Sequence, residues 1–177
     1  MTAVASSTGN TAQALRKLYL VRFGFAVVWA ALLVLTSANL GPVAITLLVL
    51  YPLFDVAAAV VDARSSHAPA LYVNIAISLL AAVGLAIAGT AGILAVLRVW
   101  GAWAIVAGLV QLFVAVSRRR MGGQWPMILS GGISVLAGSS FVVMASAEHP
   151  TLANLAGYAT IGGIFFLVSA LRLRRSV

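Results

Sequence analysis

Long apolar runs, separated by short polar or basic segments, recur from one end of the chain to the other. A helix that crosses a bilayer needs about 20 mostly apolar residues, and six runs reach that length. They cover approximately residues 18–37, 42–63, 69–89, 93–116, 125–147 and 152–171. The pattern therefore predicts an all-α protein, a bundle of six transmembrane helices.

The segments between these runs are too short to fold as separate domains. Residues 1–14, rich in Ser, Thr and Ala, predict a flexible tail, and residues 15–177 predict one membrane domain. The run from Phe23 to Leu35 has the length of a signal-peptide core. We expect it to remain in the protein, because the first two spans form a hairpin that matches two later ones.

This match comes from aligning the second, fourth and sixth spans on an aromatic residue. The aligned residues are Tyr51, Trp100 and Tyr158, at offsets of 49 and 58 residues, and each span ends on an arginine. Offsets of this size are near those of internal repeats. The alignment predicts that the bundle consists of three repeated helical hairpins.

Composition agrees with a membrane protein: 63% of the 177 residues are hydrophobic, 8% are charged, and the mean hydropathy is +1.11. Without cysteine there is neither a disulfide nor a thiolate ligand. The only histidines, His67 and His149, fall on opposite sides of the predicted membrane. We therefore expect no metal site and no cofactor. No histidine lies within a span to serve as a catalytic base, so we expect no enzyme.

The basic residues indicate the orientation. Ten of the eleven lie on one side of the predicted spans, and Arg98 alone lies on the other. By the positive-inside rule, the N- and C-termini are cytoplasmic. Anionic lipid headgroups on the cytoplasmic face are the expected partners of this charge, and no nucleic-acid partner is expected.

Two carboxylates interrupt the second apolar run. Asp55 and Asp62 are seven residues apart, so they share one face of a helix, and Pro52 precedes Asp55 by about one turn. An ionisable group at membrane depth is costly and normally faces protein or a water-filled cavity. Asp55 is therefore the residue whose surroundings require an explanation.

Depth in an antiparallel hairpin can be read from residue numbers, because residues at one level sum to twice the midpoint of the loop. The loop 37–42 makes that sum about 79. Arg22 with Asp55 gives 77. Lys17 with Asp62 gives 79. The sequence therefore predicts that each acid faces a base.

The same reasoning across the other loops predicts a polar layer in the cytoplasmic third of the membrane. Its members are Arg22, Asp55, Asp62, Asn74, Gln111, Ser130 and Ser169. One interpretation is a set of interhelical hydrogen bonds around a neutralised ion pair. The other is a hydrated pocket or a proton-accessible site.

Small residues recur every four positions in the odd-numbered spans, as in Ala26 and Ala30, or Ser130, Ser134 and Gly138. Such faces let helix backbones approach closely and are compatible with a homo-oligomer. The loop before the last span contains Glu148 and His149. A histidine, with a reference pKa of about 6.5, makes this loop a candidate for response to external acid.

Three Gly-spaced stretches carry a resemblance to a known family. They are Trp100–Gly108, with the sequence WGAWAIVAG, Gly131–Gly138, with the sequence GGISVLAG, and Tyr158–Arg172. In these the chain resembles the HdeD-like family of small bacterial membrane proteins, named after an acid-resistance protein and largely of unknown function. The resemblance implies a six-helix protein of the inner (plasma) membrane with a link to acid or envelope stress.

Two functions are open at this point. The first is a non-enzymatic membrane protein with a structural or stress-related role, as the resemblance implies. The alternative is a small transporter or channel that uses the polar layer around Asp55.

Overall fold

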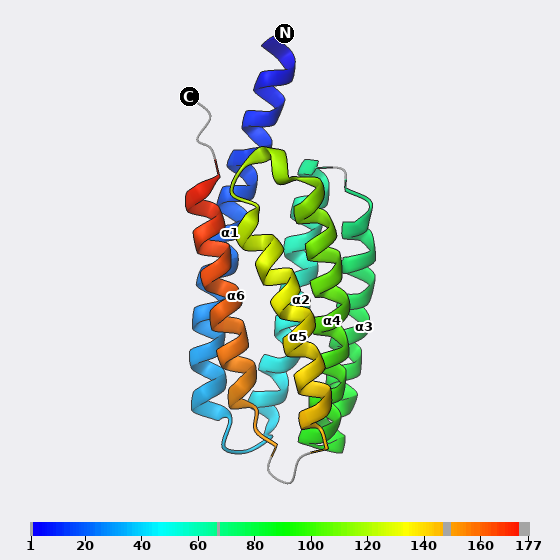
Figure 1. Ribbon diagram of the computed structural model, residues 1–177. Coiled ribbons are helices and arrows are strands. Elements are labelled where there is room, and N and C mark those ends of the chain that lie inside the picture. The colour runs from blue at the N-terminus through cyan, green and yellow to red at the C-terminus, as the bar shows by residue number, and fades with distance from the viewer. Residues whose placement is uncertain (1, 67, 147–149, 174–177) are drawn as a thin grey trace.

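The computed structural model describes residues 2–66, 68–146 and 150–173, which form a bundle of long helices (Figure 1). The elements are α1 (Thr2–Thr36), α2 (Pro42–Ser66), α3 (Ala70–Ala91), α4 (Ile93–Ser117), the 3-10 helix η1 (Arg119–Met121), α5 (Trp125–Met144) and α6 (Ala153–Arg172). All six α-helices are long and apolar enough to cross a membrane. The prediction of a six-helix bundle is confirmed, and the protein is a multi-pass membrane protein.

Helix α1 differs from its predicted extent. It begins at Thr2, so residues 2–14 are helical, where the sequence predicted a flexible tail. This stretch has no proline to stop the helix, and extending an existing helix adds one hydrogen bond for each residue that is fixed. Leu15 is fully buried. The first turns of α1 project beyond the other helices (Figure 1).

The six helices form a closed ring. Each helix packs against its neighbours in the sequence, and α1 packs against α6. The directions alternate, so the start of α1 and the end of α6 lie at the end of the bundle that also carries the α2–α3 and α4–α5 connections (Figure 1). We call this the basic end, because it carries Arg16, Lys17, Arg64, Arg118, Arg119, Arg120 and Arg172. Arg98 lies at the opposite end, where its guanidinium donates to the carbonyl of Ala145.

The predicted hairpins are present as antiparallel neighbours, but they are not the units that pack most closely. The most extensive contacts join α4 to α5, α1 to α6 and α2 to α3, and each of these pairs crosses between two predicted hairpins. The α1–α2 and α5–α6 contacts are the smallest in the ring. The repeat in the sequence therefore does not define the packing unit.

Glycines explain the close α4–α5 contact. Gly101 faces Gly138, and Gly108 faces Gly131, each pair at one level of the antiparallel crossing. A Cβ atom at Gly101 would lie 2.6 Å from the carbonyl oxygen of Gly138, and one at Gly108 would lie 2.9 Å from that of Gly131. Gly101 and Gly108 are seven residues apart on α4, and Gly131 and Gly138 are seven residues apart on α5. In each helix the two glycines therefore lie on one face. Two of the three Gly-spaced stretches that carry the family resemblance are thus the two sides of this crossing.

Toward the opposite end, the interior of the ring is filled by apolar side chains. Trp29, Tyr51, Trp100 and Trp103 pack together there with ring centroids 4.6–5.9 Å apart, a group that we call the aromatic cluster. The indole of Trp29 donates a 2.6 Å hydrogen bond to the carbonyl of Leu47 on α2. Trp29 and Trp100 are almost completely buried. This half of the ring is therefore closed.

A polar cavity inside the helix ring

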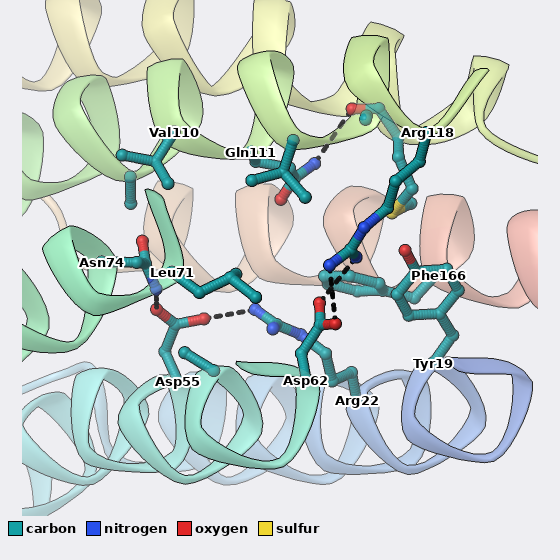
Figure 2. A pocket seen from close by; sticks show the side chains of 15 residues that line it. Tyr19, Arg22, Asp55, Asp62, Leu71, Asn74, Val110, Gln111, Arg118 and Phe166 are labelled. Atoms are coloured by element: carbon teal, nitrogen blue, oxygen red, sulfur yellow. Dashed lines mark hydrogen bonds and ion pairs between the residues drawn. The ribbon is translucent and has the colours of Figure 1, made fainter. Parts of the chain in front are cut away.

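The basic half of the ring encloses a polar cavity. It has two adjoining chambers, an outer one of about 70 Å³ nearer the basic end and an inner one of about 50 Å³ nearer the aromatic cluster. The walls of both include Arg22, Asp55, Gln111 and Phe166. A site for one water needs roughly 10–15 Å³, so the outer chamber has room for several waters or a small ion. All six helices contribute side chains to the outer chamber (Figure 2).

Asp55 lies at the centre of a hydrogen-bond network between helices. Arg22 of α1 donates to its Oδ1 atom, as the depth sum predicted. Asn74 and Ser78 of α3 donate to its Oδ2 atom over 2.6 and 2.9 Å. Three donors from two neighbouring helices therefore contact the two oxygens of this buried carboxylate.

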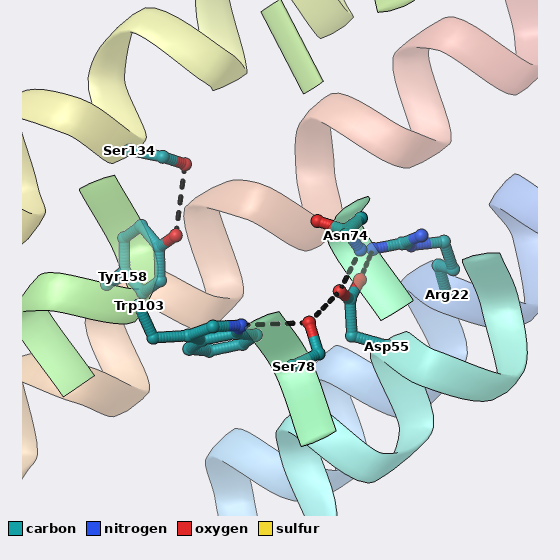
Figure 3. Close-up of polar contacts among 7 residues, drawn as sticks. All are labelled: Arg22, Asp55, Asn74, Ser78, Trp103, Ser134 and Tyr158. Atoms are coloured by element: carbon teal, nitrogen blue, oxygen red, sulfur yellow. Dashed lines mark hydrogen bonds and ion pairs between the residues drawn. The ribbon is translucent and has the colours of Figure 1, made fainter. Parts of the chain in front are cut away.

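The network extends toward the aromatic cluster. The indole nitrogen of Trp103 donates to the hydroxyl of Ser78 over 3.0 Å, and Ser78 in turn donates to Asp55 (Figure 3). Across the inner chamber, the hydroxyl of Tyr158 lies 3.0 Å from that of Ser134. The carboxylate of Asp55 is thus connected through Ser78 to Trp103 of the aromatic cluster.

Asp62 has a different partner from the predicted one. Its two carboxylate oxygens accept hydrogen bonds from both terminal nitrogens of Arg118, each at 2.9 Å. Lys17 is exposed, so the prediction that it faces Asp62 is wrong. The depth sum carries no information about which side of a helix a residue occupies. Arg118 follows directly after α4. Its planar guanidinium matches the carboxylate of Asp62 in a bidentate pair.

The Arg22 guanidinium also contacts an aromatic ring. Its central carbon lies 4.4 Å from the centroid of the Phe166 ring on α6, which is within the range of a cation–π contact. In Figure 2 the guanidinium lies between the carboxylates of Asp55 and Asp62. Arg22 therefore links α1 to both α2 and α6 within the cavity.

The structure divides the other members of the predicted polar layer. Asn74 and Gln111 line the outer chamber, and Ser130 lines the inner one. The side-chain amide of Gln111 donates to the carbonyl of Met127 over 3.1 Å. Ser169 lies elsewhere, because its hydroxyl donates to the carbonyl of Gly123 and ties α6 to the connection before α5. Depth alone again fails to determine which way a side chain points.

Three residues of the site lie outside the polar layer that the sequence predicts. They are Arg118, Ser78 and Trp103. Their connection to the acids depends on how α3 and α4 are rotated in the ring. One available signal was that Ser78 follows Asn74 by one turn and therefore shares its face.

The remaining two predictions concern an acid-responsive loop and a metal site. Glu148 and His149, the candidate acid-responsive loop, lie outside the described residues. Within residues 2–66, 68–146 and 150–173, no group of three or more His, Cys, Asp or Glu side chains is placed to hold a metal ion.

The cavity is bounded along the axis of the ring by two different structures. Toward the basic end lies the Asp62–Arg118 pair, with side chains about nine-tenths buried. Toward the opposite end lies the aromatic cluster, of which Tyr51 and Trp103 line the inner chamber.

Comparisons of the chain with protein-family models, curated proteins and solved structures give no match, so the resemblance to the HdeD-like family stays a prediction.

Proposed function

We propose that this is a non-enzymatic membrane protein whose central cavity carries a small polar solute between the two sides of the membrane. The observation that carries the proposal is a polar cavity inside a closed ring, bounded by an ion pair at one end and by packed aromatic rings at the other. Both acids of α2, Asp55 and Asp62, line this cavity.

The position of the charges supports this proposal. Ionisable residues within membrane helices are rare and generally mark ion or solute pathways. Asp55 connects to one boundary of the cavity through Ser78 and Trp103. Asp62 forms the other boundary with Arg118. Opening of either boundary would expose the cavity to one side at a time, which is the requirement for a carrier.

The test is flux into liposomes that contain the purified protein. Separate dye assays follow protons, potassium, chloride and acetate, each driven by its own gradient. We expect protein-dependent flux of at least one of these probes, lost in Asp55→Asn and retained in Arg98→Gln, a change at the opposite end. Absence of flux for all four, or equal flux in Asp55→Asn and the unchanged protein, would contradict a transport role.

A structural role is the second candidate, and one observation favours it. Each carboxylate oxygen of Asp55 accepts a hydrogen bond from α1 or α3, and each oxygen of Asp62 accepts one from Arg118, directly after α4. Satisfied polar networks of this kind help to fix the packing of membrane helices.

A link to acid or envelope stress rests on the family resemblance and on Glu148–His149. If that loop senses acid, hydrogen-exchange protection will change between about pH 7 and pH 5, and His149→Gln will abolish the change.

We also propose an orientation and a location. The basic end faces the cytoplasm and anionic lipid headgroups of the inner (plasma) membrane, as the positive-inside rule indicates.

A homo-oligomer would need a face other than the small-residue stripes of α1 and α5. Gly163 of α6 packs beside Ala26, and Gly138 packs against Gly101, so these stripes are occupied within the ring.

A further inference from the structure

We infer that the ligand of the cavity is a small monovalent anion, such as a halide or acetate, that binds to the guanidinium of Arg22. This inference rests on the proposed function, because it identifies the class of solute that the cavity accepts. Its basis is the balance of hydrogen-bond donors and acceptors around the cavity, together with charge and size.

Every carboxylate oxygen of the two acids already accepts at least one hydrogen bond. Oδ1 of Asp55 accepts from Arg22, and Oδ2 accepts from Asn74 and Ser78. Both oxygens of Asp62 accept from Arg118. A cation entering the cavity would have to share these carboxylate oxygens with the arginines that already contact them. It would also lie beside the positive charge of Arg22.

The guanidinium of Arg22 has unused hydrogen-bond donors. A guanidinium has five N–H groups. Among the described residues, Arg22 makes one hydrogen bond, to Asp55, and its ring contact with Phe166 uses no N–H group. The side-chain carbonyl oxygen of Gln111 points toward the cavity in Figure 2 and is an acceptor. An anion in the cavity would accept hydrogen bonds from the N–H groups of Arg22 that Asp55 does not use.

The charge of the basic end points to the same class. Arg64, Arg119 and Arg120 lie there, and Asp62 is the only acid among the described residues at that end. A surface of one sign raises the local concentration of the opposite ion and repels ions of its own sign. Chambers of about 70 and 50 Å³ limit the anion to a size near that of a few water molecules.

Binding is measured separately from transport. The melting temperature of the protein in detergent, without added lipid, is followed while sodium gluconate is replaced by sodium chloride or acetate at constant ionic strength. We expect a saturable rise with chloride and acetate, and no change when sodium gluconate is replaced by potassium gluconate. A response to potassium or to sulfate, but not to chloride or acetate, would overturn the anion assignment.

Variants locate the site. The double change Arg22→Gln with Asp55→Asn leaves a neutral polar pair, and we expect it to weaken chloride binding by about tenfold or more. Arg98→Gln is the control and keeps the response. If the double variant keeps full chloride affinity, the ion binds elsewhere on the surface. A rise produced by phosphatidylglycerol but not by chloride or acetate would assign the site to a lipid phosphate instead.

The binding and flux experiments fail in distinguishable ways. Chloride binding at Arg22 without flux of any probe would keep the anion site and remove the carrier function. Potassium or proton flux that depends on Asp55, without a chloride response, would keep the carrier function and remove the anion site.

Discussion

At the scale of single residues, the two membrane acids illustrate how a charge is accommodated within the bilayer. Asp55 is shared by one arginine and two neutral donors, whereas Asp62 forms a bidentate pair with one arginine. A single charge at the bilayer centre costs about 2.5–3.5 kcal/mol on insertion scales, so each acid is expected to depend strongly on its partner.

A double-mutant cycle on Arg22 and Asp55 tests this dependence. Arg22→Ala and Asp55→Ala should each lower the free energy of unfolding in detergent, by up to about 3–5 kcal/mol, because each leaves a buried charge without its partner. The double change should cost less than the sum, by about 0.5–3 kcal/mol. Chemical denaturation of the four proteins gives these values. Additive effects would show that the pair contributes no coupling energy.

The partner of Asp62 is tested by comparing two basic residues. Arg118→Gln should destabilise the protein by more than 1 kcal/mol, roughly the cost of losing hydrogen bonds to a buried charge. Lys17→Gln is the matched control, because Lys17 is exposed and a surface change typically costs no more than about 0.5 kcal/mol. Thermal unfolding of both variants provides the comparison. A larger loss for Lys17→Gln would restore the partner that depth alone predicts.

At the scale of helices, the sequence predicts how many there are and where they lie, but not how they are rotated. The length and hydropathy of the apolar runs located all six spans, because crossing a bilayer requires a minimum length. Depth within a hairpin then predicted the Arg22–Asp55 pair. The rotation of each helix depends on contacts such as the α4–α5 crossing, so the roles of Lys17 and Ser169 could not be derived.

The α4–α5 crossing is tested by adding one methyl group to a glycine. In Gly108→Ala, the new Cβ would lie 2.8 Å from the Cβ of Ser134 and 2.9 Å from the carbonyl oxygen of Gly131. We expect a loss of about 1–3 kcal/mol, the usual cost of overpacking. Gly132→Ala is the control, since its Cβ would meet nothing within 4 Å. It should be neutral or stabilising by about 0.5–1 kcal/mol, because alanine favours a helix. Equal unfolding midpoints for the two variants would contradict the contact.

At the scale of the whole molecule, the even number of helices places both ends of the chain on one side. The bundle therefore has one basic end and one end at which Arg98 is the only basic residue among those described. Reporter fusions determine which end faces the cytoplasm. We expect alkaline phosphatase fused after Arg120 to be inactive, and the same enzyme fused after Gly92 to be active, because this reporter works only outside the cytoplasm. The reverse result would invert the orientation.

Closure of the ring by α1 and α6 has a consequence for the time course of synthesis. Helix α1 ends at Thr36 and α6 ends at Arg172. At about 5–20 residues per second, the 136 residues between these positions take about 7–27 s to make. During that interval α1 lies in the membrane without α6, the helix with which it makes its most extensive contacts. A ribosome that stalls before α6 would therefore leave a five-helix arc whose polar interior is exposed to lipid, a state that membrane quality control can distinguish from the finished protein.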